Sequence, residues 1–138
     1  MPFDPAGVNW QQLRQVVLLT VEEDTSALRP ALEALHRALP EAVFTLDEPS
    51  SLVSFIHQLE SRSFEAAIVW TPPGRSPHAL AYGCYLAGIP IRVGQSQEFG
   101  GGVLSPWVRP PIEPVPLTEY YLHLLRSAGI LAPTPLQF

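Results

Sequence analysis

The sequence contains no lysine: its eight basic residues are all arginine. Without a lysine amine, Schiff-base catalysis and the lysine-dependent phosphate binding of P-loop proteins are excluded. Positive charge is scarce as well, since the formal net charge is −5 and the arginines form no cluster. A nucleic-acid-binding surface requires the opposite pattern. We therefore expect no nucleic-acid partner.

Cysteine and long apolar runs are also scarce. The single Cys84 excludes an internal disulfide bond, which is consistent with a reducing, cytoplasmic location. No apolar run approaches the roughly 20 residues that span a bilayer, and the first residues show no secretory signal. We expect a cytoplasmic protein without a transmembrane segment, while contact with the membrane periphery stays open.

Signatures of metal and cofactor binding are missing too. No Gly-x-Gly-x-x-Gly follows the first expected strand, and no Gly-x-Ser-x-Gly nucleophile turn is present. The histidines show no metal-ligand spacing to one another or to Cys84; they are His36, His57, His78 and His123. We expect no metal and no cofactor, and we interpret Cys84 as a core residue because its segment is apolar.

The composition indicates one compact domain. Of the 138 residues, 46% are hydrophobic and only 15% are charged, which favours a buried core over disorder. The sixteen prolines gather in segments that indicate loops: residues 71–74, 106–116 and 133–135. We expect an N-terminal arm at 1–12, a domain at 13–130 and a proline-rich tail or linker start at 131–138.

Apolar runs of strand length alternate with helical patterns along this domain. Strands are expected at residues 15–20, 43–46, 66–70 and 91–93. Helices are expected at residues 26–39, 52–59, 76–88 and 118–128. Alternation of this kind produces βαβ units with right-handed crossovers. The predicted fold class is therefore α/β, a Rossmann-like three-layer domain with a mainly parallel sheet.

The most distinctive segment is residues 80–107, an apolar helix followed by a glycine stop, a short strand and a glycine-dense loop. Within it, residues 85–101 match the pattern Tyr-Leu-Ala-Gly-Ile-Pro-x-Arg-x-Gly-x-Ser-x-Glu-Phe-Gly-Gly. This pattern resembles the N-terminal domain of family 9 glycosyltransferases, the heptosyltransferase group. Residues 30–42 are similar to the first helix of that family, and the resemblance extends over about 14–130.

The resemblance implies a single half of a GT-B architecture. In that family two Rossmann-like domains enclose the active site, and the C-terminal domain binds most of the nucleotide-sugar donor. The present sequence ends in a segment that resembles the start of the interdomain linker. We therefore expect an acceptor-binding domain related to lipopolysaccharide heptosyltransferases that is not catalytic alone.

The resemblance also implies a catalytic base, but this sequence differs from the family at the positions concerned. The family carries Gly-Asp after its first strand, and the aspartate is proposed to deprotonate the acceptor hydroxyl. The corresponding pair here is Glu23 and Asp24, and a bulky residue in place of glycine changes the turn. The alternative is that Asp24 favours a helix N-terminus. The family's aspartate–arginine pair before its last helix corresponds to Glu119 and either Tyr120 or Tyr121.

Two loops supply the ligand-binding candidates. In the first, Arg75, Ser76 and His78 open a helix, where backbone amides favour an anion; the alternative is an ordinary capped loop. In the second, hydroxyl, amide and carboxylate groups suit the hydroxyls of a sugar; the alternative is a mobile surface loop. Its candidates, with the strand that precedes it, are Arg92, Gln95, Ser96, Glu98, Gly100 and Gly101.

The expected ligand is a sugar or a phosphorylated glycan acceptor. Two other functions stay open. The chain could be a non-catalytic scaffold or interaction subunit that pairs as a homodimer through the 95–107 loop. It could also be one half of a split glycosyltransferase whose partner is a separately encoded donor domain.

Overall fold

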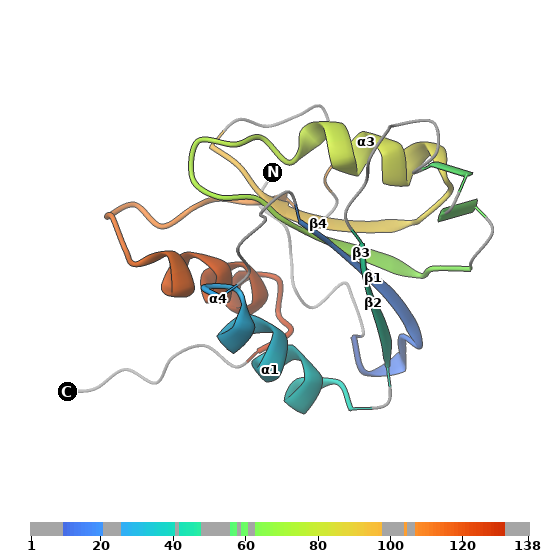
Figure 1. Ribbon diagram of the computed structural model, residues 1–138, viewed down its shortest axis with the longest axis horizontal. Coiled ribbons are helices and arrows are strands. Elements are labelled where there is room, and N and C mark those ends of the chain that lie inside the picture. The colour runs from blue at the N-terminus through green and yellow to red at the C-terminus, as the bar shows by residue number, and fades with distance from the viewer. Residues whose placement is uncertain are drawn as a thin grey trace.

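The structure is a computed structural model that describes residues 10–20, 26–40, 42–47, 56–57, 59–60, 63–97, 104 and 107–131. In this part of the chain, five parallel strands form one sheet in the order β2-β1-β3-β4-β5 (Figure 1). The strands are β1 (Gln15–Thr20), β2 (Val43–Asp47), β3 (Ala66–Trp70), β4 (Ile91–Gln95) and β5 (Trp107–Val108). The predicted α/β class with a parallel sheet is confirmed.

Helices cover both faces of this sheet. The short 3-10 helix η2 (Trp10–Gln12) precedes β1, and the α-helices are α1 (Arg29–Ala38), α3 (His78–Leu86) and α4 (Leu117–Ser127). Figure 1 shows α1 and α4 together on one face and α3 on the other. Residues 56–57 and 59–60 of the expected second helix are helical, and Leu59 is buried beside α3.

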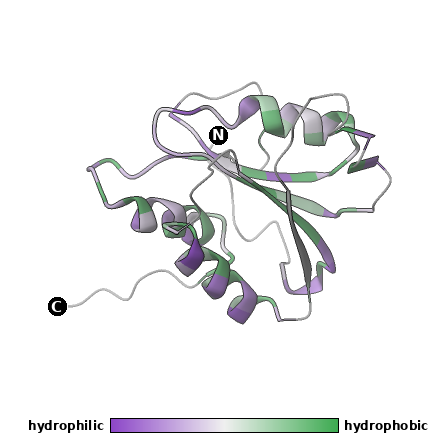
Figure 2. Cartoon of the chain, viewed as in Figure 1, coloured by the Kyte–Doolittle hydropathy of each residue, from purple (hydrophilic) through white to green (hydrophobic). Residues whose placement is uncertain are grey.

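The two faces explain why the strand sequences are continuously apolar. Val16 and Leu18 of β1 belong to the core cluster under α1 and α4, whereas Val17 and Leu19 belong to the cluster under α3. β1 thus buries both sets of its alternating side chains, as is typical of a strand inside a parallel sheet. Unlike these apolar strands, α1 carries both hydrophilic and hydrophobic residues, which alternate along the helix (Figure 2).

The helix ends are set by proline and glycine. Pro30 occupies the first turn of α1, where its missing N–H leaves no hydrogen bond unmade. After α3 the chain reverses at Gly88, whose φ of +86° is unfavourable for any side chain. This is the glycine stop that the sequence predicts.

Two features differ from the expectations. Within the supposed arm at 1–12, Trp10 is only 4% exposed, and its indole N–H donates a hydrogen bond to the Ala128 carbonyl at 2.9 Å. Trp10–Gln12 is therefore part of the domain, while residues 1–9 and 132–138 lie outside the described residues. The strand β5 was not predicted, because two residues between proline-rich segments give no periodic signal.

No helix in the described part of the chain is both long and apolar enough to cross a membrane.

Candidate functional site

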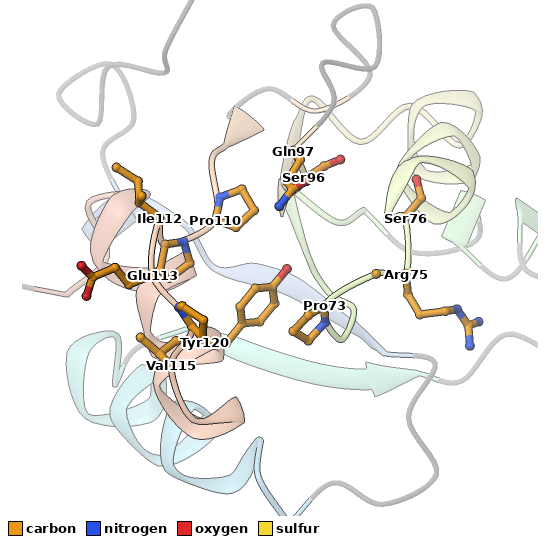
Figure 3. A pocket seen from close by; sticks show the side chains of 13 residues that line it. Pro73, Arg75, Ser76, Ser96, Gln97, Pro110, Ile112, Glu113, Val115 and Tyr120 are labelled. Atoms are coloured by element: carbon orange, nitrogen blue, oxygen red, sulfur yellow. The ribbon is translucent and has the colours of Figure 1, made fainter.

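A pocket of about 560 Å³ opens at the carboxyl ends of β3 and β4. In open parallel sheets this edge is where ligands bind, and the volume lies within the roughly 300–1,000 Å³ typical of small-molecule sites. Three connections contribute to it: the loop from β3 to α3, the start of the loop after β4, and the segment between β5 and α4 (Figure 3). The lining residues are Pro73, Gly74, Arg75, Ser76, Ser96, Gln97, Pro110, Pro111, Ile112, Glu113, Pro114, Val115 and Tyr120.

The pocket has an apolar and a polar side. Prolines and Val115 from the segment before α4 form most of the apolar wall, Pro73 adds to it from the β3 loop, and Ile112 lies at the edge with its side chain fully exposed. Ser76, Ser96 and Gln97 offer hydrogen-bonding groups. An arrangement of apolar surface with a few polar groups is suited to a ligand that has both kinds of surface.

Tyr120 is the central side chain of the pocket. It lies in the first turn of α4, is 7% exposed, and points its hydroxyl into the cavity between Pro73 and Pro110 (Figure 3). Burial raises the pKa of the Tyr120 phenol above its ordinary value of 10.0. The phenol is therefore a neutral hydrogen-bond donor at physiological pH.

The backbone that carries Tyr120 is fixed by the sheet. Gln95, the last residue of β4, donates from Nε2 to the Tyr120 carbonyl at 2.7 Å and is only 3% exposed. Trp70, the last residue of β3, donates from its indole N–H to the Tyr121 carbonyl at 3.4 Å. Two neighbouring strands thus hold the same turn of α4 by buried hydrogen bonds.

The start of α3 forms the opposite side of the pocket. The Ser76 hydroxyl accepts a hydrogen bond from the backbone N–H of His78 at 3.2 Å and lies 3.0 Å from Nδ1 of the same residue. The N-cap residue of α3 is Pro77 and has no side-chain cap, so the predicted cap by Ser76 is wrong; the Ser76 hydroxyl instead bonds the first helical residue from the position before the N-cap. Arg75 is exposed, and Figure 3 shows its guanidinium pointing away from Tyr120.

The end of β4 is packed closely against the chain that follows it. A Cβ atom added at Gly94 would lie 2.8 Å from Cδ2 of Leu104 and 3.3 Å from Cβ of Pro77. Leu104 is 3% exposed and clusters with Ala81 of α3. A side chain at position 94 would therefore require the end of the Leu104 side chain to shift.

The structure brings part of the predicted site together. Arg75, Ser76 and Ser96 line the pocket, and Gln95 lies behind it. His78 is adjacent through Ser76 and is not a lining residue. The remaining candidates at 24, 98, 100 and 101 lie outside the described residues, as does most of the 95–107 loop.

Arg92 is not brought to the pocket. It lies near the start of β4, is 9% exposed, and donates to the carbonyls of Ile89 at 2.7 Å and Pro90 at 3.3 Å. Its guanidinium carbon lies 5.2 Å from the centre of the Tyr85 ring. These contacts tie β4 to the C-terminal end of α3, where a positive charge is favourable.

Cys84 is a core residue, as its apolar segment indicates. It is fully buried, and desolvation raises the pKa of its thiol to about 12, against a smaller lowering by Arg92. A thiol with this pKa is not a nucleophile near neutral pH. Over the described ranges, no three His, Cys, Asp or Glu residues are grouped as a metal site would require.

Sequence reasoning missed Tyr120, Gln97 and the wall at 110–115. The Pro-rich segment indicated only a loop, and Tyr120 was considered only as one of two residues in place of the family's arginine, with no ligand-binding role. A possible signal was the pairing of an aromatic residue at a helix start with a preceding proline-rich segment, but many surface loops share it.

No family model, curated protein or solved structure matches this chain. Function must therefore be argued from the pocket.

Proposed function

We propose that the chain is a saccharide-binding domain of the acceptor-side type, related to family 9 glycosyltransferases, that binds its ligand without transferring sugar alone. The observation that supports this is the pocket at the carboxyl edge of the sheet, with the Tyr120 hydroxyl at its centre. Hydroxyl and amide groups on one side and proline rings on the other match the two kinds of surface of a sugar ring. Residues 85–101 match the pattern of family 9 glycosyltransferases, and this resemblance is the reason for choosing a saccharide as the ligand class.

Binding without transfer is consistent with the acids near the pocket. Glu113 is the only carboxylate among the described lining residues, and Figure 3 shows it pointing away from the Tyr120 hydroxyl. A general base must lie within hydrogen-bond reach of the proton it removes. Asp24, the base implied by the resemblance, lies outside the described residues.

Calorimetric titration of the chain with mono- and oligosaccharides tests the binding, and incubation with ADP-heptose tests transfer. We expect a saccharide to bind and no nucleotide sugar to be consumed. Turnover of ADP-heptose by the chain alone, lost in Asp24→Asn, would instead establish a catalytic domain. The Asp24→Asn variant is also the control for binding, which it should leave unchanged.

A second function, self-association as an interaction subunit, is favoured by the outer face of α3. Tyr82, Tyr85 and Leu86 are 48%, 56% and 45% exposed, and the two tyrosine rings stack with centroids 6.2 Å apart. The helix carries no acidic residue and no arginine, whereas the chain has a net charge of −5. Copies that share a negative net charge repel least where the facing surfaces carry no acidic side chain, and the charged group beside Tyr85 is the guanidinium of buried Arg92. We infer that a second copy is the partner of this face.

Light scattering at micromolar concentrations tests the second function. A dimer that Tyr85→Ser dissociates would support the α3 face, whereas one that only Trp107→Ala dissociates would support the 95–107 loop. A monomer at all concentrations would exclude both surfaces as homodimer contacts.

A further inference from the structure

We propose that the pocket selects an uncharged saccharide over a phosphorylated one because its charged side chains point away from the cavity, and that Tyr120 binds this ligand by donating a hydrogen bond to one of its oxygens. This inference rests on the proposed saccharide-binding function and decides between the two ligand types that the sequence leaves open.

The charged side chains among the lining residues do not point into the pocket. Arg75 and Glu113 are the only charged residues among the thirteen that line the pocket. Both point away from its centre (Figure 3). Among these described lining residues, a phosphate in the cavity would find no cation directed at it and would lose hydration, which is costly.

The N-terminus of α3 has a backbone amide that is already hydrogen-bonded within the chain. The sequence suggests an anion site here, because free backbone amides at a helix start attract negative charge. In the structure the His78 amide is already bonded to the Ser76 hydroxyl at 3.2 Å. This bond satisfies within the chain one of the amides that an anion would otherwise use.

Tyr120 places an uncharged hydrogen-bond donor in the pocket. Its ring is buried and its hydroxyl reaches into the cavity, so the phenol is the polar group that a ligand meets at the centre. Burial raises the phenol pKa, which keeps it protonated and uncharged. A neutral donor beside proline rings suits an oxygen on a ring with apolar C–H faces, and the bond from Gln95 to the Tyr120 carbonyl keeps the helix turn in place.

The test is an NMR titration of the full chain with matched probes: D-glucose, D-mannose and D-galactose, each beside its 6-phosphate. Side-chain signals of the tyrosines, assigned with single Tyr→Phe variants, report binding at Tyr120 directly. We expect the neutral sugars to shift the Tyr120 signal and the 6-phosphates to bind no more tightly. Tyr120→Phe should weaken binding about three- to tenfold, the effect of one net hydrogen bond.

Arg75→Gln is a second test variant: because the Arg75 guanidinium points away from the cavity, its removal should change the affinity for either probe less than about twofold. Circular dichroism confirms that both variants fold. Tighter binding of the 6-phosphates, lost in Arg75→Gln, would overturn the selection while leaving saccharide binding intact. Binding that leaves the Tyr120 signal unshifted would overturn the role of Tyr120. If no probe binds, the proposed function itself fails.

Discussion

Gln95 at the end of β4 donates a 2.7 Å hydrogen bond to the carbonyl of Tyr120 in the first turn of α4. The two residues are 25 positions apart in the chain, and both are buried. This contact joins the sheet edge to the helix that supplies the central group of the pocket. We therefore expect a change at this contact to affect both the stability of the domain and the shape of the pocket.

Replacing Gln95 with leucine should cost about 1 kcal/mol of unfolding free energy, since one buried hydrogen bond is lost. The loss is moderate because the Gln95 Oε1 atom finds no partner in the described part of the protein, so leucine also removes a buried unsatisfied oxygen. Urea unfolding measures this loss of unfolding free energy. Gln95→Glu should be clearly worse at neutral pH, because it buries a carboxylate against a carbonyl. Equal stability of the two variants would show that this bond contributes little.

Gly94→Ala should destabilise the domain by about 1–3 kcal/mol, because the new Cβ would lie 2.8 Å from Leu104. Leu104→Ala should cost about 2–5 kcal/mol through the cavity that it leaves. The double variant should be more stable than the sum of the two predicts, since the smaller side chain makes room for the methyl group. Strictly additive free energies in chemical denaturation would contradict the close packing of these two positions.

Unfolding free energy should fall as the pH rises above about 9. The Cys84 thiol has a pKa near 9.0 when unfolded and about 12 when folded, so above pH 9 the unfolded chain releases a proton that the folded chain retains. The slope from this group approaches about 1.4 kcal/mol per pH unit. Below about pH 8 the Cys84 thiol should cause no pH dependence of the unfolding free energy. The decrease that it causes above pH 9 should be absent in Cys84→Ala.

The same burial should protect Cys84 from thiol reagents. Native protein at pH 8 should react with a disulfide reagent only as fast as it unfolds, and denatured protein should react at once. Fast labelling of the folded chain would show that the thiol is accessible and would remove the basis of the pH prediction.

Trp10→Phe should lower stability by about 1–2 kcal/mol, because the Ala128 carbonyl loses the indole N–H at 2.9 Å while the aromatic packing is largely kept. Trp10→Ala should cost about 3–5 kcal/mol, because the buried ring is removed as well. Thermal unfolding of the two variants separates the contributions. Wild-type stability in both would mean that this part of the N-terminal segment is a loose arm after all.

The sequence by itself determined the layers of this protein. The continuous apolar runs at 15–20 and 66–70 predict strands buried on both faces, and the intervening helical patterns require parallel pairing. The glycine after α3 was also predictable, because helix ends depend on nearby residues. All of these signals are local.

Only the tertiary structure decided the composition of the pocket. Whether Arg75, Ser96 and Tyr120 meet depends on the strand order, in which β3, β4 and β5 are neighbours, and on the face that α4 covers. Side-chain direction is also a tertiary property, so the sequence could not show that Arg75 points outward while the Tyr120 hydroxyl points in. Arg92 illustrates the same limit: it belongs to the family-like pattern, yet its position in the strand places it at the end of β4 away from the pocket, because a strand advances roughly 3.3 Å per residue.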